Sequence, residues 1–442
     1  MNFPISKEIL HEAVKSLNIK QLATASIRDL VALVNVLEQK TGTKFVRMEM
    51  GVPGLPSPQV AVEAEAAAMQ RGVSAVYPNL DGVPELKSEI ARFVKLFVNV
   101  DVEPKHCVPA VGSTQSTFAS FLVANNCHKN RSKGTLFIDP GFNVNKLQVN
   151  LLQQKYESFD VFHYRGEKLR DKLESYLQTG EFQSILYSNP NNPTWQCFTT
   201  EELQIIGELA TKYDVIVIED LAYFGMDFRR DYSHPGTFPY FPTAASYTDN
   251  YLLLISSSKA FSYAGQRVGM MVISPKLFSR EFPDLEQRFG RARFGEAMIS
   301  AALYGLSAGV THSAQFGLAA LLKATNDGLF NFVESTKIYG EKTHLTKKMF
   351  TDNGFHIVYD KDGNEPIGDG FYFTVGFNDL DSNQILELIL QYGMCALALD
   401  TTGSELKGVL RICTSLVPEE QLDELQERLE RLHENKSVNT VN

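Results

Sequence analysis

Residues 134–275 alternate apolar runs with stretches of helical periodicity. Such an alternation predicts a mainly parallel β-sheet covered by helices on both faces, because parallel strands need crossover connections that bury both faces. Ligands of these sheets bind beyond the carboxyl ends of the strands. The expected strands are 135–139, 160–164, 184–189, 215–220, 252–256 and 268–274. The expected helices between them are 145–154, 168–177 and 200–213.

Length and charge limit the classes of protein to consider. With 442 residues, the chain is long enough for two or three domains with a substantial core. A formal net charge of −10 argues against nucleic acid or an anionic membrane as a partner. No apolar run approaches the roughly 20 residues of a membrane helix. We therefore expect neither a nucleic-acid nor a membrane partner.

The N-terminus and the cysteines favour a cytoplasmic enzyme. Residues 1–8 contain no basic region leading into an apolar one, so we expect no secretion signal. The cysteines are widely scattered and include no CxxC pair, which supports neither a zinc site nor a disulfide framework. They are Cys107, Cys127, Cys197, Cys395 and Cys413.

A lone lysine, Lys259, lies in a small-residue turn between two apolar runs, 251–255 and 268–273. Burying a lysine costs free energy, and a nucleophilic lysine uses that cost, because desolvation lowers its pKa and favours a Schiff base. Ser256 and Arg267 could hold an anion beside it. The alternative is a surface hairpin with a solvated lysine, and this stretch alone leaves both interpretations open.

Three further positions carry candidate polar groups. Ser113 and Thr114 lie where a short strand turns into a helix, a geometry that cradles phosphate, although a helix cap without ligand has the same pattern. Asp220 ends an apolar strand and could pair with a cofactor cation or cap a helix. Arg411 lies inside an apolar run, where it needs an anion, either a substrate carboxylate or an internal salt-bridge partner.

Several motifs occur in one order along the chain, from about Gly51 to about His433. They are the turn at 112–114, the aromatic turn at 139–142, NPxNPT at 189–194, DxAY at 220–223, the SxxK and GxRxG segments at 256–269, and the late arginine. In this order they resemble fold-type I pyridoxal-phosphate enzymes of the aspartate aminotransferase superfamily.

That resemblance implies an α/β fold with two domains. The large domain, expected at 56–325, would carry a mainly parallel seven-stranded sheet flanked by helices and would bind the cofactor. The smaller α+β domain would combine residues 326–442 with most of an N-terminal segment, 1–55. The family often holds two of these prolines in cis, so we expect cis bonds at Asn192-Pro193 and Asp139-Pro140.

The resemblance also assigns roles to residues. Lys259 would form the aldimine with pyridoxal 5'-phosphate and transfer the α-proton. Asp220 would bind the pyridine nitrogen, Tyr223 and Asn192 the phenolic oxygen, and Phe142 would stack on the ring. The phosphate would be held by Ser113, Thr114, Ser256, Arg267 and, from the partner subunit of a homodimer, Tyr77. The substrate carboxylate would be bound by Arg411, Asn192 and Gly51. For Tyr77, Phe142 and Gly51, packing or linker roles are the alternatives.

The expected reaction moves the amino group of an amino acid to a 2-oxo acid. A pyridoxal-phosphate lyase, a non-catalytic protein of the same fold and a nicotinamide enzyme are the alternatives, the last disfavoured because no GxGxxG follows a strand. No metal is expected. The substrate side chain stays undetermined: residues 300–304 lack the arginine of dicarboxylate-specific members, while Arg291 and Arg293 precede them. Trp195 stands where the family usually has glycine, and its indole could narrow the pocket entrance.

Overall fold

The computed structural model describes residues 4–130 and 134–439. Its contacts divide the chain into two units. The sheet unit comprises Leu55–Asn191 and Cys197–Thr336, and the terminal unit comprises Met1–Gly54, Asn192–Gln196 and Lys337–Asn442. The division after Thr336 falls later than the expected boundary at 325/326, because Phe332 and Val333 still pack in the core of the sheet unit.

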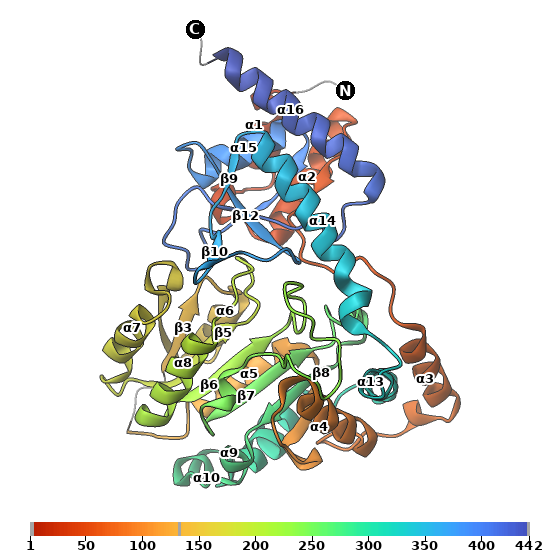
Figure 1. Ribbon diagram of the computed structural model, residues 1–442, viewed down its shortest axis with the longest axis vertical. Helices are drawn as coiled ribbons and strands as arrows, with labels where there is room; N and C mark the ends of the chain where they lie inside the picture. The colour runs from red at the N-terminus through yellow and green to blue at the C-terminus, as the bar shows by residue number, and fades with distance from the viewer. Residues whose placement is uncertain (1–3, 131–133, 440–442) are drawn as a thin grey trace. The chain divides into compact units, whose positions relative to one another are not determined.

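Seven strands form the sheet of the sheet unit, in the order β2-β8-β7-β6-β5-β3-β4. Figure 1 labels β3, β5, β6, β7 and β8 of this sheet. Only β8 runs antiparallel to its neighbours, which confirms the expected mainly parallel, seven-stranded sheet. The strands are β2 (Cys107–Ala110), β3 (Gly134–Asp139), β4 (Lys155–Asp160), β5 (Phe182–Ser188), β6 (Ile216–Leu221), β7 (Tyr251–Ser256) and β8 (Gly269–Ile273).

One expected strand was wrong. Residues 160–164 were expected to be a strand, but β4 ends at Asp160, and Val161–Tyr164 form a 3₁₀ helix. Strand β4 lies at the edge of the sheet beside β3 alone, and its first four residues are exposed or half-buried. An edge strand needs no apolar run, so the sequence pattern pointed instead to the apolar residues that follow it.

Helices cover both faces of this sheet. Alternate residues of a strand point to opposite faces, so each strand contributes side chains to two different cores. Leu252 and Leu254 of β7 pack in one core with α5, whereas Leu253 and Ile255 pack in another with α4 and α13. The helices of the sheet unit are α3 (Gln59–Gln70), α4 (Pro84–Val98), α5 (Gly112–Ala124), α6 (Val144–Leu151), α7 (Lys168–Leu177), α8 (Thr200–Tyr213), α9 (Pro275–Ser279), α10 (Pro283–Phe289), α11 (Phe294–Ala297), α12 (Tyr304–Ser307) and α13 (His312–Asn326).

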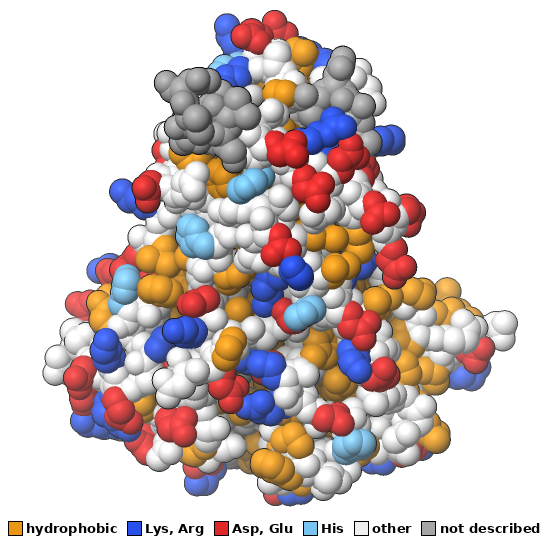
Figure 2. Space-filling model, turned by 45° about the horizontal axis from the view of Figure 1, so that its top comes forward, with side chains coloured by type: hydrophobic (Ala, Val, Ile, Leu, Met, Phe, Trp, Pro, Cys, Tyr) orange, Lys and Arg blue, Asp and Glu red, His pale blue; other side chains and the backbone are white. Residues whose placement is uncertain are grey.

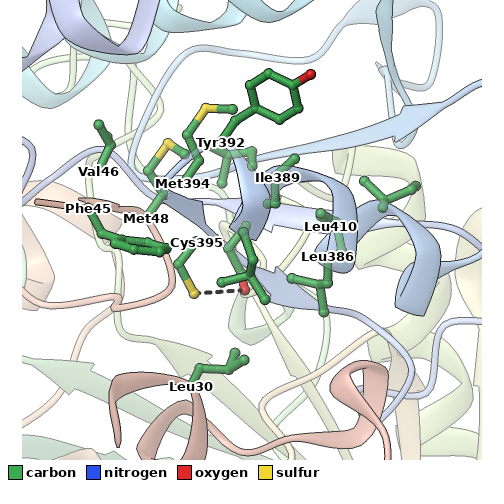
Figure 3. Close-up of a cluster of buried hydrophobic side chains, with 14 of the residues drawn as sticks. Leu30, Phe45, Val46, Met48, Leu386, Ile389, Tyr392, Met394, Cys395 and Leu410 are labelled. Atoms are coloured by element: carbon green, nitrogen blue, oxygen red, sulfur yellow. Dashed lines mark hydrogen bonds between the residues drawn. The ribbon is translucent and has the colours of Figure 1, made fainter. Parts of the chain in front are cut away.

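The terminal unit is built around a four-stranded antiparallel sheet in the order β14-β15-β12-β9. A parallel pair, β1 with β13, joins the two ends of the chain in one core (Figure 3). The elements are α1 (Lys7–Ser16), α2 (Ile27–Thr41), β1 (Val46–Arg47), α14 (Phe332–Asp352), β9 (Phe355–Ile357), β10 (Lys361–Asp362), β11 (Glu365–Pro366), β12 (Phe373–Phe377), α15 (Ser382–Gln391), β13 (Met394–Cys395), β14 (Leu397–Ala398), β15 (Leu410–Ile412) and α16 (Leu422–Asn439).

An aromatic cluster fixes the start of α14 in the sheet unit. The ring of Phe332 lies 5.3 Å from Phe261, 5.4 Å from Phe97 and 5.8 Å from Phe93, measured between ring centroids. Phe261 follows Lys259 by two residues, so the cluster also anchors the lysine turn. The buried ring explains why the division between the units follows Phe332 rather than preceding it.

We expect Phe332→Ala to lower the free energy of unfolding by about 3–5 kcal/mol, because it removes a buried ring and leaves a cavity among neighbouring rings. Chemical denaturation followed by fluorescence measures this change. Leu329→Ala is the matched control, because that side chain lies nearby in the chain and is 82% exposed. Equal effects of the two substitutions would contradict the anchoring role of Phe332.

Candidate active site

The register of the sheet brings the candidate polar residues to one edge. Asp220 lies opposite Ser188 on β5 and Leu254 on β7. Ser256, at the end of β7, lies opposite Gly269, which in turn lies opposite Ala110 at the end of β2. The turns that follow β2, β5, β6 and β7 therefore begin at neighbouring positions. This is the edge at which a ligand of a parallel sheet is expected.

The lysine turn is held by its own hydrogen bonds. The backbone N–H of Ser258 donates to Ser256 Oγ at 3.1 Å, and the hydroxyl of Ser257 donates to the carbonyl oxygen of Val268. Lys259 is half-buried, and Ser262 has a φ of +47°. The turn is therefore a built connection between two buried strands, and Lys259 is not the fully solvated residue of a plain hairpin.

The turn before α5 forms a concavity suited to an anion. The hydroxyl oxygen of Ser113 is buried and has no hydrogen-bond partner among the described residues. A Cβ added to Gly112, which has a φ of +66°, would lie 2.5 Å from Arg267 Nη2. A Cβ on Gly269 would lie 3.1 Å from the backbone nitrogen of Ser113. Two glycines thus leave room beside a helix N-terminus, an arginine and an unsatisfied hydroxyl, which together fit a phosphate.

The remaining phosphate candidates lie at the same end of the sheet. Ser256 is buried at the end of β7, whereas Thr114 and Arg267 are exposed. Arg267 adopts a left-handed conformation with a φ of +51° and donates from Nη1 to the carbonyl oxygen of Ala264 at 2.7 Å. Its other nitrogen reaches the space above Gly112.

Asp220 is a buried carboxyl group on the face of β6 that carries α5. It is 7% exposed, and burial raises its pKa to about 7, opposed by a hydrogen bond from the backbone N–H of Ala222 at 3.1 Å. A cation placed beside this carboxylate would lower the pKa again, because it stabilises the charged form. Tyr223, three residues later, is also buried.

Glu219 is a buried acid that the sequence interpretation did not single out. Its side chain points to the opposite face of β6 and accepts hydrogen bonds from Thr243 Oγ1 at 2.5 Å and from the backbone N–H of Ala244 at 3.3 Å. Burial raises the pKa of Glu219 to about 7. The sequence does contain a sign of this buried acid, because an acidic residue within a nearly all-apolar strand needs a polar partner.

The aromatic turn and the Asn-Pro turns have the expected backbone. Asp139-Pro140 and Asn192-Pro193 are both cis, which confirms the two predictions, and Asn189-Pro190 and Phe238-Pro239 are cis as well. The side-chain amide of Asn191 donates to the carbonyl oxygen of Pro140 at 2.8 Å and so links the two turns. The ring of Phe142 is 37% exposed, so it is available for stacking.

Within the terminal unit, Arg411 is buried on β15 and is held by neutral groups. Its Nη2 donates to the carbonyl oxygen of Glu49 at 2.6 Å, and its Nη1 donates to Asn192 Oδ1 at 3.1 Å. Its Nε is buried without a hydrogen-bond partner among the described residues. The Glu49 carboxyl is also buried; burial raises its pKa, and the nearby Arg47 and Arg411 oppose that rise. Arg411 therefore retains an unused donor that suits an anion.

Gly51 and Trp195 belong to the surroundings of Arg411. A Cβ on Gly51 would lie 2.0 Å from Tyr372 Oη, so this position requires glycine. Trp195 has a φ of +66°, which accounts for glycine being usual there in the family that the sequence resembles. Its indole is fully buried and packs within the terminal unit, so it does not form an exposed rim of an entrance.

Tyr77 lies on the surface of the sheet unit. It lies in the turn before α4 and is 91% exposed. It shares a surface hollow with Val76 and with residues 307–313, which follow a π-helical segment, Met298–Leu303. The arginines that precede that segment, Arg291 and Arg293, are exposed.

Comparisons with known proteins place these features in a family. The family described as "Aminotransferase class I and II" matches residues 43–429. A probable aspartate aminotransferase of Methanocaldococcus jannaschii is 22% identical over 77% of this chain and 83% of its own. An aromatic-amino-acid aminotransferase of Thermococcus litoralis is 23% identical over 89% and 93%. An alanine aminotransferase structure from Pyrococcus furiosus has a TM-score of 0.76 at 21% identity, covering 93% of this chain and 98% of that one.

The buried Glu219 predicts a pH-dependent stability. Its folded pKa of about 7 lies above the ordinary value of 4.5, so the stability that comes from the protonated form is present at low pH and is lost as pH rises through 7. We expect Glu219→Gln, which cannot ionise, to gain stability relative to wild type between pH 5 and pH 8, by on the order of 3 kcal/mol.

Thermal unfolding of both proteins across this pH range provides the measurement. Asp220 titrates in both, so its contribution cancels in the difference. Glu286→Gln, at an exposed position of the same unit, is the control and should show no such trend. A difference between Glu219→Gln and wild type that stays constant with pH would contradict the prediction.

Proposed function

Since the chain belongs to the class I and II aminotransferase family, we propose that it binds pyridoxal 5'-phosphate through the amino group of Lys259 and transfers amino groups from an amino acid to a 2-oxo acid. The observation that carries this assignment is the anion cradle formed by Gly112, Gly269 and the unsatisfied Ser113 hydroxyl. Gly112 and Ser113 follow β2, and β2 pairs with β8, the strand that follows the lysine turn.

Each residue of the sheet unit has a distinct task in this proposal. Ser113, Thr114, Ser256 and Arg267 bind the phosphate, and Phe142 supports one face of the ring. Pyridoxal phosphate, when bound, supplies an electron sink for negative charge at the substrate α-carbon. Asp220 keeps the ring nitrogen protonated, because its buried carboxylate is stabilised by a neighbouring cation. Tyr223 donates to the phenolic oxygen, and Asn192, which the chain division assigns to the terminal unit, is proposed to do the same.

Lys259 would have a second task, which is to move a proton. Its amine would take the proton from the substrate α-carbon as a base and later return a proton as an acid. Lys259 is half-buried at the end of the sheet where the cofactor is proposed to bind.

Arg411 is proposed to bind the α-carboxylate of the substrate, with Asn192 and Gly51 beside it. Its buried and unused Nε supports this role, since a carboxylate would satisfy it. The amino donor stays undetermined, because the relatives are named for aspartate, aromatic and alanine substrates. The comparisons favour amino transfer over lyase chemistry, since all these relatives are named as aminotransferases.

We propose a homodimer with a shared site. The surface around Tyr77 is apolar and exposed, as expected for an interface with a second copy. Its exposed apolar members are Met69, Val76 and Tyr77, which line one surface hollow. In the dimer, the hydroxyl of Tyr77 would donate to the phosphate bound by the partner subunit.

We place the enzyme in the cytoplasm, without nucleic acid or membrane as a partner. The five cysteines form no disulfide, which fits a reducing compartment. On the face shown in Figure 2, lysines and arginines are interspersed with acidic side chains. No helix within residues 4–130 and 134–439 is long and apolar enough to cross a membrane.

Borohydride reduction of the protein loaded with pyridoxal phosphate should fix the cofactor on Lys259, as peptide mapping by mass spectrometry would show. Lys259→Arg should abolish the label and amino transfer together. Lys342→Arg is the matched control, because Lys342 is another half-buried lysine, whose pKa burial lowers. A label on any other lysine of the wild-type protein would refute the site assignment.

Tyr77→Phe should weaken cofactor retention by about five- to tenfold, the effect of losing about 1 kcal/mol or somewhat more for a hydrogen bond to a charged group. The dissociation constant of pyridoxal phosphate measures this. Tyr240→Phe is the control, because the Tyr240 hydroxyl donates instead to the carbonyl oxygen of Gly236. Sedimentation over a dilution series tests the dimer separately, and a fully active monomer would show the shared site to be wrong.

A further inference from the structure

The guanidinium of Arg411 is held at its edges and on one face. The two edge bonds go from Nη2 to Glu49 and from Nη1 to Asn192. The face is covered by the ring of Tyr372, whose centroid lies 4.4 Å from Arg411 Cζ. A planar cation held only by two edge bonds can tilt, whereas a ring beneath it restrains the plane and attracts the charge.

Tyr372 is itself fixed from two sides. Its hydroxyl oxygen occupies the space in which a side chain of Gly51 would lie, 2.0 Å from the position of an added Cβ. On the other side, Trp195 meets the Tyr372 ring edge to face, with centroids 6.0 Å apart and an interplanar angle of 73°. Tyr372 is 1% exposed, so its ring has no room to turn away from the arginine.

Trp195 depends in turn on a second glycine. A Cβ on Gly370 would lie 1.9 Å from Trp195 Cε2, so only glycine makes room for the indole. The left-handed backbone of Trp195 is a strained conformation for a bulky residue. Trp195 therefore packs against a glycine and beside the ring that covers Arg411, in a strained backbone conformation. This arrangement indicates a specific role in positioning that ring rather than general filling of the core.

We infer that Tyr372 and Trp195 are positioning residues that hold the Arg411 guanidinium in the plane required to bind an α-carboxylate. They therefore set the preference of the enzyme for amino acids over simple amines. This inference rests on the proposed role of Arg411. It concerns the carboxylate alone, so it predicts a selective defect that general loosening of the terminal unit would not produce.

The test uses the holoenzyme and single-turnover amino transfer, followed by the loss of cofactor absorbance. Three amino acids, L-alanine, L-aspartate and L-phenylalanine, are each compared with the amine that lacks the α-carboxylate: ethylamine, β-alanine and phenethylamine. Each titration separates the apparent Kd from the limiting rate constant. The most reactive amino acid and its amine then serve for all variants.

For Tyr372→Leu we expect the Kd of the amino acid to rise roughly tenfold, in the range that a lost cation–π contact gives. The limiting rate constant and the Kd of the amine should change less than twofold. Tyr372→Phe keeps the ring and should behave as wild type. Trp195→Leu should raise the Kd of the amino acid about threefold, and it provides the test if Tyr372→Leu does not fold.

Two controls separate the possible failures. Tyr359→Leu removes another fully buried tyrosine of the terminal unit, one whose hydroxyl pairs with Ser404, and should leave the selectivity unchanged. Arg411→Ala should abolish the preference for the amino acid; if it does not, the proposed role of Arg411 is wrong. The positioning role is overturned if Arg411→Ala has this effect while the folded Tyr372→Leu and Trp195→Leu variants do not. In that case the two variants either change the Kd of the amino acid and the Kd of the amine equally, or change neither Kd.

Discussion

The pairing of β7 with β8 and of β8 with β2 is the constraint on which the candidate site depends. It places Ser256, Gly269 and Ala110 in one row across three strands. Each of these residues begins or ends a strand, so the lysine turn, the arginine of the GxRxG segment and the turn before α5 all start from the same edge. The hydrogen-bonded ladder makes this edge rigid, and glycine at 269 keeps it open for an anion.

Desolvation then gives the buried polar residues of both units their character. Asp220 and Glu219 are neighbours in sequence but point to opposite faces of β6, and burial raises both pKa values to about 7. Oε2 of Glu219 accepts hydrogen bonds from Thr243 and Ala244, which ties this carboxyl group to the neighbouring loop. Asp220 accepts a hydrogen bond from the backbone N–H of Ala222. In our proposal, a cofactor cation completes its surroundings. Arg411 is buried as well, but it is a cation, so in our proposal an anion, the substrate carboxylate, completes its surroundings.

The sequence predicted the sheet, the order of its motifs and two cis prolines, and it failed where packing contradicts a local pattern. Strand β4 was missed because an edge strand carries no apolar run. The start of α14 packs in the sheet unit, which the sequence did not indicate, because the burial of Phe332 among rings distant in sequence leaves no trace in its neighbours in the chain. Trp195 was noticed as a departure, but nothing local indicated that it packs against Gly370 and Tyr372, which lie far from it in sequence.

The hydrophobic periodicity of the sequence predicted the class of fold, because periodicity reports burial. The sequence also marked a lysine, an aspartate and an arginine as candidate site residues, because such groups need partners in apolar surroundings. How these groups are held depends on the packing of the folded chain. The anion cradle joins residues 112, 113, 267 and 269, and the support of Arg411 joins residues 51, 192, 195, 370 and 372. Such contacts depend on strand register and on the space left by glycines, which are properties of the packed chain rather than of any segment within it.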